Sequence, residues 1–146
     1  MLRDRNKMKS AIFLFFVLVV ATGYYFFAQQ EAPSIRFSAE NRTLAFYGSK
    51  NTAAAFSFDT LTAIELYDDA VPAYGTAVSG GEVYGGYLYG TWRNDQLGEY
   101  EAFVSTRMNT YVIVKDDEKT AIFNTSNEEL TRNLYKQLYA FWQNEL

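Results

Sequence analysis

The sequence predicts a mainly β domain that is closed by one C-terminal helix and preceded by one transmembrane helix. Three observations favour this fold class. Short runs with alternating apolar residues follow one another between turn signals, as in antiparallel sheets. A long amphipathic pattern comes at the end of the chain, and an uncharged apolar run comes near its start. We therefore expect a partly open antiparallel barrel of seven to eight strands, capped by an amphipathic helix.

The apolar run covers residues 11–28. Four basic residues precede it: Arg3, Arg5, Lys7 and Lys9. As a helix the run would be about 27 Å long, slightly short for a bilayer core of about 30 Å but sufficient. A cleaved signal peptide has a similar pattern, and that alternative stays open. An uncleaved signal anchor is favoured, because cleavage after Ala28 would put the bulky Phe26 where a small residue is needed.

The charge distribution predicts how the chain crosses the membrane. Residues 1–10 have a net charge of +3, whereas the rest of the chain carries nine basic and sixteen acidic side chains, a net charge of −7. Basic segments stay in the cytoplasm, so we expect a prokaryotic single-pass protein of the cell membrane with its C-terminal domain outside. The predicted parts are a cytoplasmic tail (1–10), a signal anchor (11–28), a linker (29–33) and one domain (34–146).

The composition excludes several classes of function. The chain has no cysteine, so it has neither a lipidation site nor disulfides, and it has no histidine. The commonest general base and the commonest zinc ligand are therefore missing. An acidic domain argues against binding nucleic acid and against docking on anionic lipid headgroups. We expect no catalytic residues, no cofactor and no metal.

The expected strands are short and separated by turn residues. They lie at residues 35–37, 43–47, 54–58, 60–67, 87–92, 100–105, 111–114 and 121–123. Residues 74–90 hold six of the nine glycines and are interpreted as a longer loop that leads into the strand 87–92. The final helix is expected to begin at a capping box formed by Ser126 and Glu129. Its apolar residues recur at helical spacing: Leu130, Leu134, Leu138 and Phe141.

The order of strands, the glycine-aromatic middle and the closing helix form one combined pattern. Its segments are residues 35–37, 55–58, 64–66, 86–90, 97–100, 111–114, 122–124 and 134–138. The pattern resembles the bacterial pleckstrin-homology (PH-like) domains that follow an N-terminal membrane helix, over roughly residues 34–142. The resemblance implies a PH-like, partly open barrel of unassigned molecular role. Phosphoinositide binding is not expected, because the first hairpin region offers only Arg36, Arg42 and Lys50 among acidic residues.

Four aromatic residues are the candidate binding residues: Tyr84, Tyr87, Tyr89 and Trp92. Exposed rings in this stretch would stack on a carbohydrate or on peptide side chains. The favoured alternative is a barrel strand with Tyr87 and Tyr89 on one face and Trp92 on or near the other, where the glycines permit a sharp bend.

Two acidic groups, residues 68–69 and 116–118, are candidates for calcium binding or for a carboxylate-based hydrolase. They are interpreted as solvated turn residues, because neither has the ligand spacing of a dedicated calcium loop. The expected function is a non-catalytic module that binds a membrane or envelope protein or peptide through a sheet edge or loop. A module that binds cell-wall glycan or a small ligand is the alternative.

Overall fold

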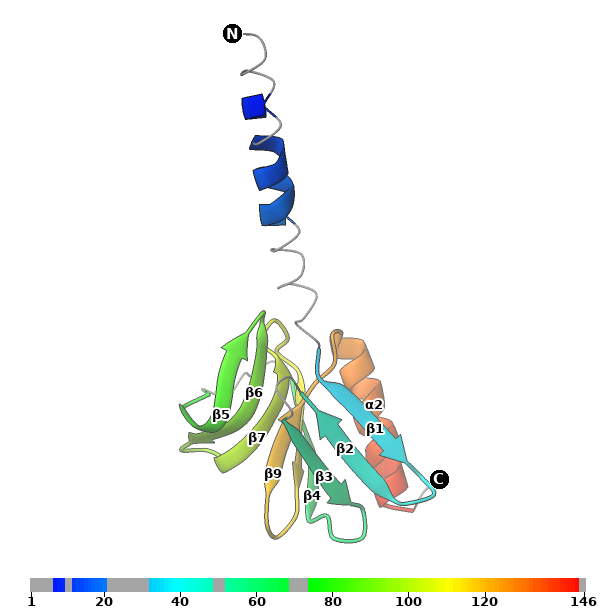
Figure 1. Ribbon diagram of the computed structural model, residues 1–146. Coiled ribbons are helices and arrows are strands. Elements are labelled where there is room, and N and C mark those ends of the chain that lie inside the picture. Colours follow the sequence, from blue (N-terminus) through cyan, green and yellow to red (C-terminus); the bar gives the residue numbers. More distant parts are fainter. Residues whose placement is uncertain (1–6, 10–11, 21–31, 49–51, 69–73, 145–146) are drawn as a thin grey trace. The chain divides into compact units, whose positions relative to one another are not determined.

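The computed structural model describes residues 7–9, 12–20, 32–48, 52–68 and 74–144 (Figure 1). The chain divides into two compact units, Met1–Glu31 and Ala32–Leu146. In the first unit, residues 12–20 are helical and their side chains are exposed. No helix within the described ranges is both long and apolar enough to cross a bilayer. The predicted anchor also includes residues 11 and 21–28, and these lie outside the described residues.

The second unit is mainly β and ends in a helix, as the sequence predicts. Its strands are β1 (Ser34–Ser38), β2 (Thr43–Tyr47), β3 (Ala53–Ser57), β4 (Ala63–Tyr67), β5 (Thr76–Tyr84), β6 (Tyr87–Asn94), β7 (Gly98–Ser105), β8 (Tyr111–Lys115) and β9 (Thr120–Phe123). The helix is α2 (Glu128–Trp142). The described residues thus contain nine strands where seven to eight are expected, and the additional strand is β5.

The strands form two separate sheets. The first sheet has the order β1-β2-β3, and the second has the order β4-β8-β9-β7-β6-β5. Neighbouring strands are antiparallel, except that β7 and β9 are parallel. The expected antiparallel pairing is therefore found at every neighbouring pair of the described strands except this one. The reason is that the β8–β9 hairpin inserts β9 between β8 and β7, and this places β9 alongside β7 in the same direction.

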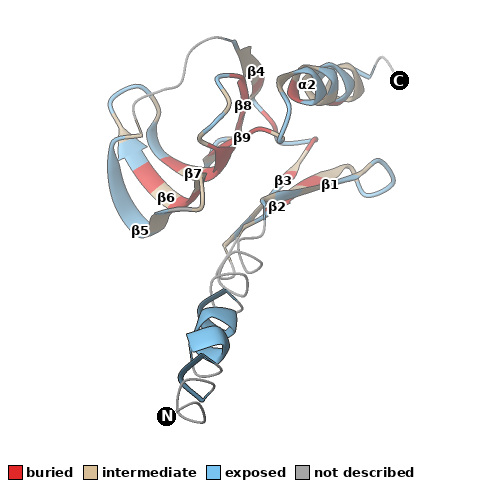
Figure 2. Cartoon of the chain, turned by 90° about the horizontal axis from the view of Figure 1, so that it is seen from above, coloured by how far each residue is buried: buried red, intermediate tan, exposed pale blue. Residues whose placement is uncertain are grey.

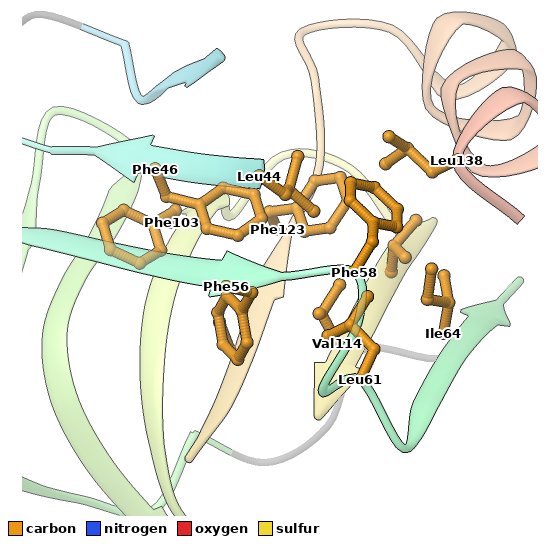
Figure 3. Close-up of a cluster of buried hydrophobic side chains, with 12 residues drawn as sticks. Leu44, Phe46, Phe56, Phe58, Leu61, Ile64, Phe103, Val114, Phe123 and Leu138 are labelled. Atoms are coloured by element: carbon orange, nitrogen blue, oxygen red, sulfur yellow. The ribbon is translucent and has the colours of Figure 1, made fainter. Parts of the chain in front are cut away.

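One hydrophobic cluster joins the two sheets and the helix (Figure 3). Phe46 of β2 contacts Phe123 of β9 and Phe103 of β7, with ring centroids 4.7 and 5.4 Å apart. Leu138 brings α2 into the same cluster and is 1% exposed. Because residues from both sheets and from the helix share this cluster, its apolar burial stabilises the whole second unit.

A second cluster lies on the opposite face of the second sheet. Its buried members are Leu88, Trp92, Tyr100, Ala102, Val104, Tyr111, Ile113 and Ile122. Successive residues of β8 therefore alternate between the two clusters, with Val112 and Val114 in the first and Ile113 in the second. This burial on both faces explains why β8 reads as a continuous apolar run, since neither face of the strand meets water.

The start of α2 differs from the predicted capping box. Asn127 is the N-cap, and its side-chain Oδ1 accepts the backbone N–H of Leu130 at 3.1 Å. The predicted capping box of Ser126 and Glu129 is therefore wrong, and the N-cap lies one residue later. Asparagine is as good an N-cap as serine. Glu128 and Glu129 occupy the first turn, where negative charge stabilises the helix.

Candidate functional site

The four aromatic candidates lie on the hairpin formed by β5 and β6. Tyr89 is only 2% exposed and Trp92 only 9%, whereas Tyr87 is partly buried. The rings of Tyr87 and Tyr89 are tilted by 42° to one another, with centroids 6.1 Å apart. Tyr84 ends β5, and its side chain lies outside the part of the chain that the structure describes.

Tyr89 and Trp92 point to opposite faces of β6. Trp92 belongs to the second cluster, and its indole Nε1 donates to the carbonyl of Tyr89 at 2.7 Å. The ring of Tyr89 lies on the other side, beside Gly48 at the end of β2. Buried rings cannot stack on a sugar. Both residues therefore belong to the core, as in the strand interpretation, and do not provide the exposed surface that carbohydrate binding requires.

β5 is the outer strand of the second sheet, and no described strand lies beyond it. Figure 2 shows it as a mostly exposed strand beside the more buried β6. It has nine residues and contains one charged side chain, that of Glu82, and no proline. Val78 and Val83 are 45% and 56% exposed. Natural edge strands usually carry charges, proline or β-bulges against pairing with other chains. In β5 the charge is Glu82 alone and the irregular part lies between Ala77 and Glu82, so the end of the strand after Glu82 has little of this protection.

The other outer strands are shorter and less accessible. β1, β3 and β4 have five residues each. α2 packs against β4, and Phe37 of β1 contacts Phe141 of α2 with ring centroids 4.9 Å apart. β3 contains three alanines, a residue type that is depleted in strands. Among the described outer strands, β5 is thus the best candidate for adding another strand.

Irregular pairing divides β5 into two parts. The register with β6 shifts between Ala77 and Ser79 and again between Ser79 and Glu82. Gly90 of β6 has φ +81°, and a Cβ there would overlap the carbonyl of Gly80. The two strands approach so closely at this point because glycine leaves room for backbone contact. Beyond the irregular part, Glu82–Tyr84 pair regularly with Tyr87–Tyr89.

The turn between β5 and β6 determines which backbone groups of β5 face outward. Gly85 and Gly86 have φ +60° and +82°, the signature of a two-residue type I′ turn. The residues that flank such a turn, Tyr84 and Tyr87, form a hydrogen-bonded pair, and the next pair along the hairpin does not. The N–H and C=O of Val83 therefore point away from β6, toward the free edge.

A polar cleft of about 360 Å³ lies where β5 begins. Gly75 and Thr76 line it together with residues 93–96, which form the end of β6 and the start of the turn to β7. Its one cation, Arg93, forms an ion pair with Glu99 at 2.9 Å. Asp95 lies in the same lining, so the cleft has no strong preference for either charge.

The acidic candidates take part in local structure. Asp68 accepts hydrogen bonds from Arg132 and from the Thr110 hydroxyl, the latter at 2.6 Å. These contacts, chiefly those of Arg132, hold the pKa of Asp68 below its ordinary value. Asp116 accepts the backbone N–H groups of Glu118 and Lys119 at 2.9 and 2.8 Å, which fits its interpretation as a turn residue. Asp69 lies outside the described residues.

Tyrosines gather along the second cluster. The rings of Tyr67 and Tyr111 are stacked with centroids 5.3 Å apart. The hydroxyl of Tyr100 donates to the carbonyl of Tyr74 at 2.8 Å. Burial raises the pKa of Tyr100 to about 12. A tyrosine that stays protonated at neutral pH acts here as a hydrogen-bond donor, so these contacts are structural.

Comparison with protein-family models, with characterised proteins and with solved structures found no match to this chain. The PH-like resemblance therefore stays a prediction.

The edge strand β5 is the candidate feature that the sequence does not predict, because the glycines of residues 74–90 suggest a loop. A signal for it is nevertheless present. Gly85-Gly86 stands between the segments Glu82–Tyr84 and Tyr87–Tyr89, which carry valine, leucine and tyrosines. Two glycines between such segments indicate a hairpin with a type I′ turn.

Proposed function

We propose that this protein is a non-catalytic interaction module that binds an extended protein or peptide segment as an additional strand on β5. The accessible edge carries this proposal, above all the outward backbone groups of Val83. An added strand gains main-chain hydrogen bonds at such an edge, and pockets or side chains beside it provide specificity. The rigid part of the module is the second unit, whose two sheets and helix share one core.

The proposal includes a membrane tether. Its support is the uncharged run 11–28 between a tail of net charge +3 and a remainder of net charge −7. In this arrangement residues 11–28 contact the bilayer, the N-terminus is cytoplasmic, and the module works outside the cell membrane of a bacterium. A tethered module would meet membrane or envelope proteins at a raised local concentration.

The proposed domain type is a PH-like barrel. Two sheets around a shared cluster and a C-terminal helix that packs on it support this assignment. Nine described strands and the parallel β7–β9 pair are the points on which this chain departs from the expected barrel.

A crosslinking experiment on intact cells tests the proposal. The chain has no cysteine, so Val78→Cys places a single reactive thiol on the exposed face of β5. In this background, Val83→Pro removes the outward N–H but no hydrogen bond to β6, and proline is tolerated at such edge positions. Val83→Thr is the matched control, because it keeps the N–H and the strand preference.

We expect a specific adduct with Val78→Cys that is lost with Val83→Pro and kept with Val83→Thr. A thiol at Glu129→Cys, exposed on α2, should not give this adduct. An adduct that survives Val83→Pro in a folded protein would rule out strand addition at this position.

A further inference from the structure

We infer that the strand taken up by β5 is β5 of a second copy of this chain. The two strands are antiparallel, and Ala77 of each copy lies opposite Val83 of the other. This inference rests on the proposed function and names the partner.

Ala77 is a second residue of β5 whose backbone groups point outward. It is paired with Trp92 of β6. The carbonyls of Thr91 and Arg93, on either side of Trp92, face β5, because a Cβ on the facing glycine would overlap each of them. Backbone groups alternate in direction along a strand, so those of Trp92 face β7. The N–H and C=O of Ala77 are therefore not bonded to β6 and point to the free edge.

A two-fold axis through Gly80 satisfies both outward positions at once. Ala77 and Val83 lie three residues before and after Gly80. In an antiparallel pair of β5 strands, Ala77 of each copy therefore meets Val83 of the other, and both pairs exchange main-chain hydrogen bonds. The irregular part of β5 lies between these pairs, and at its centre a Cβ on Gly80 would meet open space. The same surface on the two copies is thus complementary to itself.

The side chains of β5 permit this pairing. Ala77 and Val83 are both exposed, so neither pair contains a charged or buried side chain. Glu82, the one charged residue of β5, lies two residues after Gly80. The Glu82 residues of the two copies therefore lie on opposite sides of the axis, and like charges are not placed directly opposite one another.

The first sheet lies where two copies in one membrane require it. It packs on one face of the second sheet, where Phe46 contacts Phe103. The cluster on the other face contains none of the described residues of the first sheet. An axis perpendicular to the joined second sheets keeps both first sheets on the same side. Both copies of β1, with which each module begins, thus lie on one side of the dimer, as two copies tethered in one membrane need.

Two backbone pairs make a small interface, so dimer formation depends on concentration. Tethering in a membrane raises the concentration of one copy around another. Micelles that hold one chain each leave the β5 edge free. The test therefore uses the purified full chain in vesicles of phosphatidylcholine.

Disulfide formation between two variants tests the register. Paired residues of antiparallel strands have Cα atoms about 5.5 Å apart, which is within reach of a disulfide. Ala77→Cys and Val83→Cys are oxidised together in the same vesicles, and each is also oxidised alone. We expect at least about tenfold more disulfide-linked dimer in the mixture, because each residue lies far from its own counterpart across the axis.

A second mixture measures chance collisions within the membrane. In it, Glu129→Cys replaces Ala77→Cys, because Glu129 is exposed on α2. α2 packs on β4, at the opposite end of the second sheet from β5. Equal dimer in the two mixtures, or as much dimer from one variant alone, would overturn the inference.

The mass of the adduct in cells distinguishes this failure from failure of the proposed function. In the experiment with Val78→Cys, an adduct of two chains supports both. No dimer from the purified variants, together with a cellular adduct to another protein that Val83→Pro removes, means that strand addition stands and the second copy is the wrong partner. If neither experiment gives an adduct, both the inference and strand addition at β5 are wrong.

Discussion

Arg132 of α2 holds Asp68 at the end of β4 through both carboxylate oxygens, with Nη2 2.8 Å from Oδ1 and Nε 3.0 Å from Oδ2. Glu128 adds a second carboxylate 3.5 Å from the same guanidinium. Because the two partners are 64 residues apart in the chain, this pair joins the helix to the second sheet at the surface, beside the apolar cluster that joins them inside.

The Asp68 pair predicts a loss of stability in acid. The pKa of Asp68 is lowered in the folded protein by Arg132 and Thr110 from an ordinary value of 3.8. Its contribution to stability is therefore present above that value and is lost as the pH falls through the lower folded value. We expect urea unfolding between about pH 5 and pH 2 to show a smaller acid loss in Asp68→Asn than in the wild type.

Asp117→Asn is the control for this measurement, because Asp117 is an exposed carboxylate in the turn between β8 and β9. A wild-type acid loss that persists unchanged in Asp68→Asn would show that the pair with Arg132 does not contribute.

Tyr100 predicts a second loss of stability, at alkaline pH. Its folded pKa is raised to about 12 from 10.0, chiefly by burial. The folded state thus retains a proton that the unfolded chain releases, so this contribution is complete below about pH 10 and disappears as the pH rises toward 12. We expect Tyr100→Phe to flatten the fall in unfolding free energy over this range. If the unfolding free energy of Tyr100→Phe falls as steeply as that of the wild type over this range, other groups cause the alkaline loss.

Gly90 predicts a large backbone effect. A side chain at Gly90 would have both a positive φ and an overlap with the carbonyl of Gly80. Gly98 also has a positive φ, +68°, but a Cβ there would meet open space. We expect Gly98→Ala to cost about 1 kcal/mol and Gly90→Ala at least about 2 kcal/mol more, measured by urea unfolding. Equal costs would contradict the close approach of β5 and β6.

Two leucines of α2 test how the helix is held. Leu138 is 1% exposed in the first cluster, whereas Leu130 is 56% exposed in the first turn. We expect Leu138→Ala to lower the unfolding free energy by about 2–5 kcal/mol, because it leaves a cavity in the core. Leu130→Ala should change it by less than about 0.5 kcal/mol. A similar cost for both would mean that the helix is not packed through Leu138.

The proposed tether predicts the fate of the N-terminal segment in cells. We expect the protein in the membrane fraction to keep its full mass of 16.7 kDa and to resist extraction at alkaline pH. An intact-mass measurement detects cleavage directly. A shorter protein that lacks residues 1–28, released from the membrane, would instead identify the run as a signal peptide.

Much of the fold can be predicted from local pattern. The bounds of β2 agree with the alternation of Leu44 and Phe46, and α2 follows from the spacing of its leucines. The sheet order cannot be predicted in this way, because the parallel neighbour of β9 depends on long-range pairing rather than on its own residues. β8 does not show the alternation of a half-exposed strand, because the sheet and its neighbours bury both of its faces.

The candidate site is harder to predict from the sequence than the fold is. Aromatic residues in a glycine-rich stretch suggest a binding surface, but Tyr89 and Trp92 are both buried, on opposite faces of β6. The exposed edge instead belongs to β5, whose glycines suggest a loop. That Val83 faces outward depends on the turn at Gly85 and Gly86 and on the place of β5 at the end of the sheet order.

Amide hydrogen exchange at Val83, measured by NMR on the full chain without a partner, tests the central claim most directly. If β5 offers a free edge, the Val83 amide exchanges at least about 100-fold faster than that of Leu88, its buried neighbour on β6. An amide of Val83 as well protected as that of Leu88 would mean that its N–H is already bonded, which would contradict strand addition at β5.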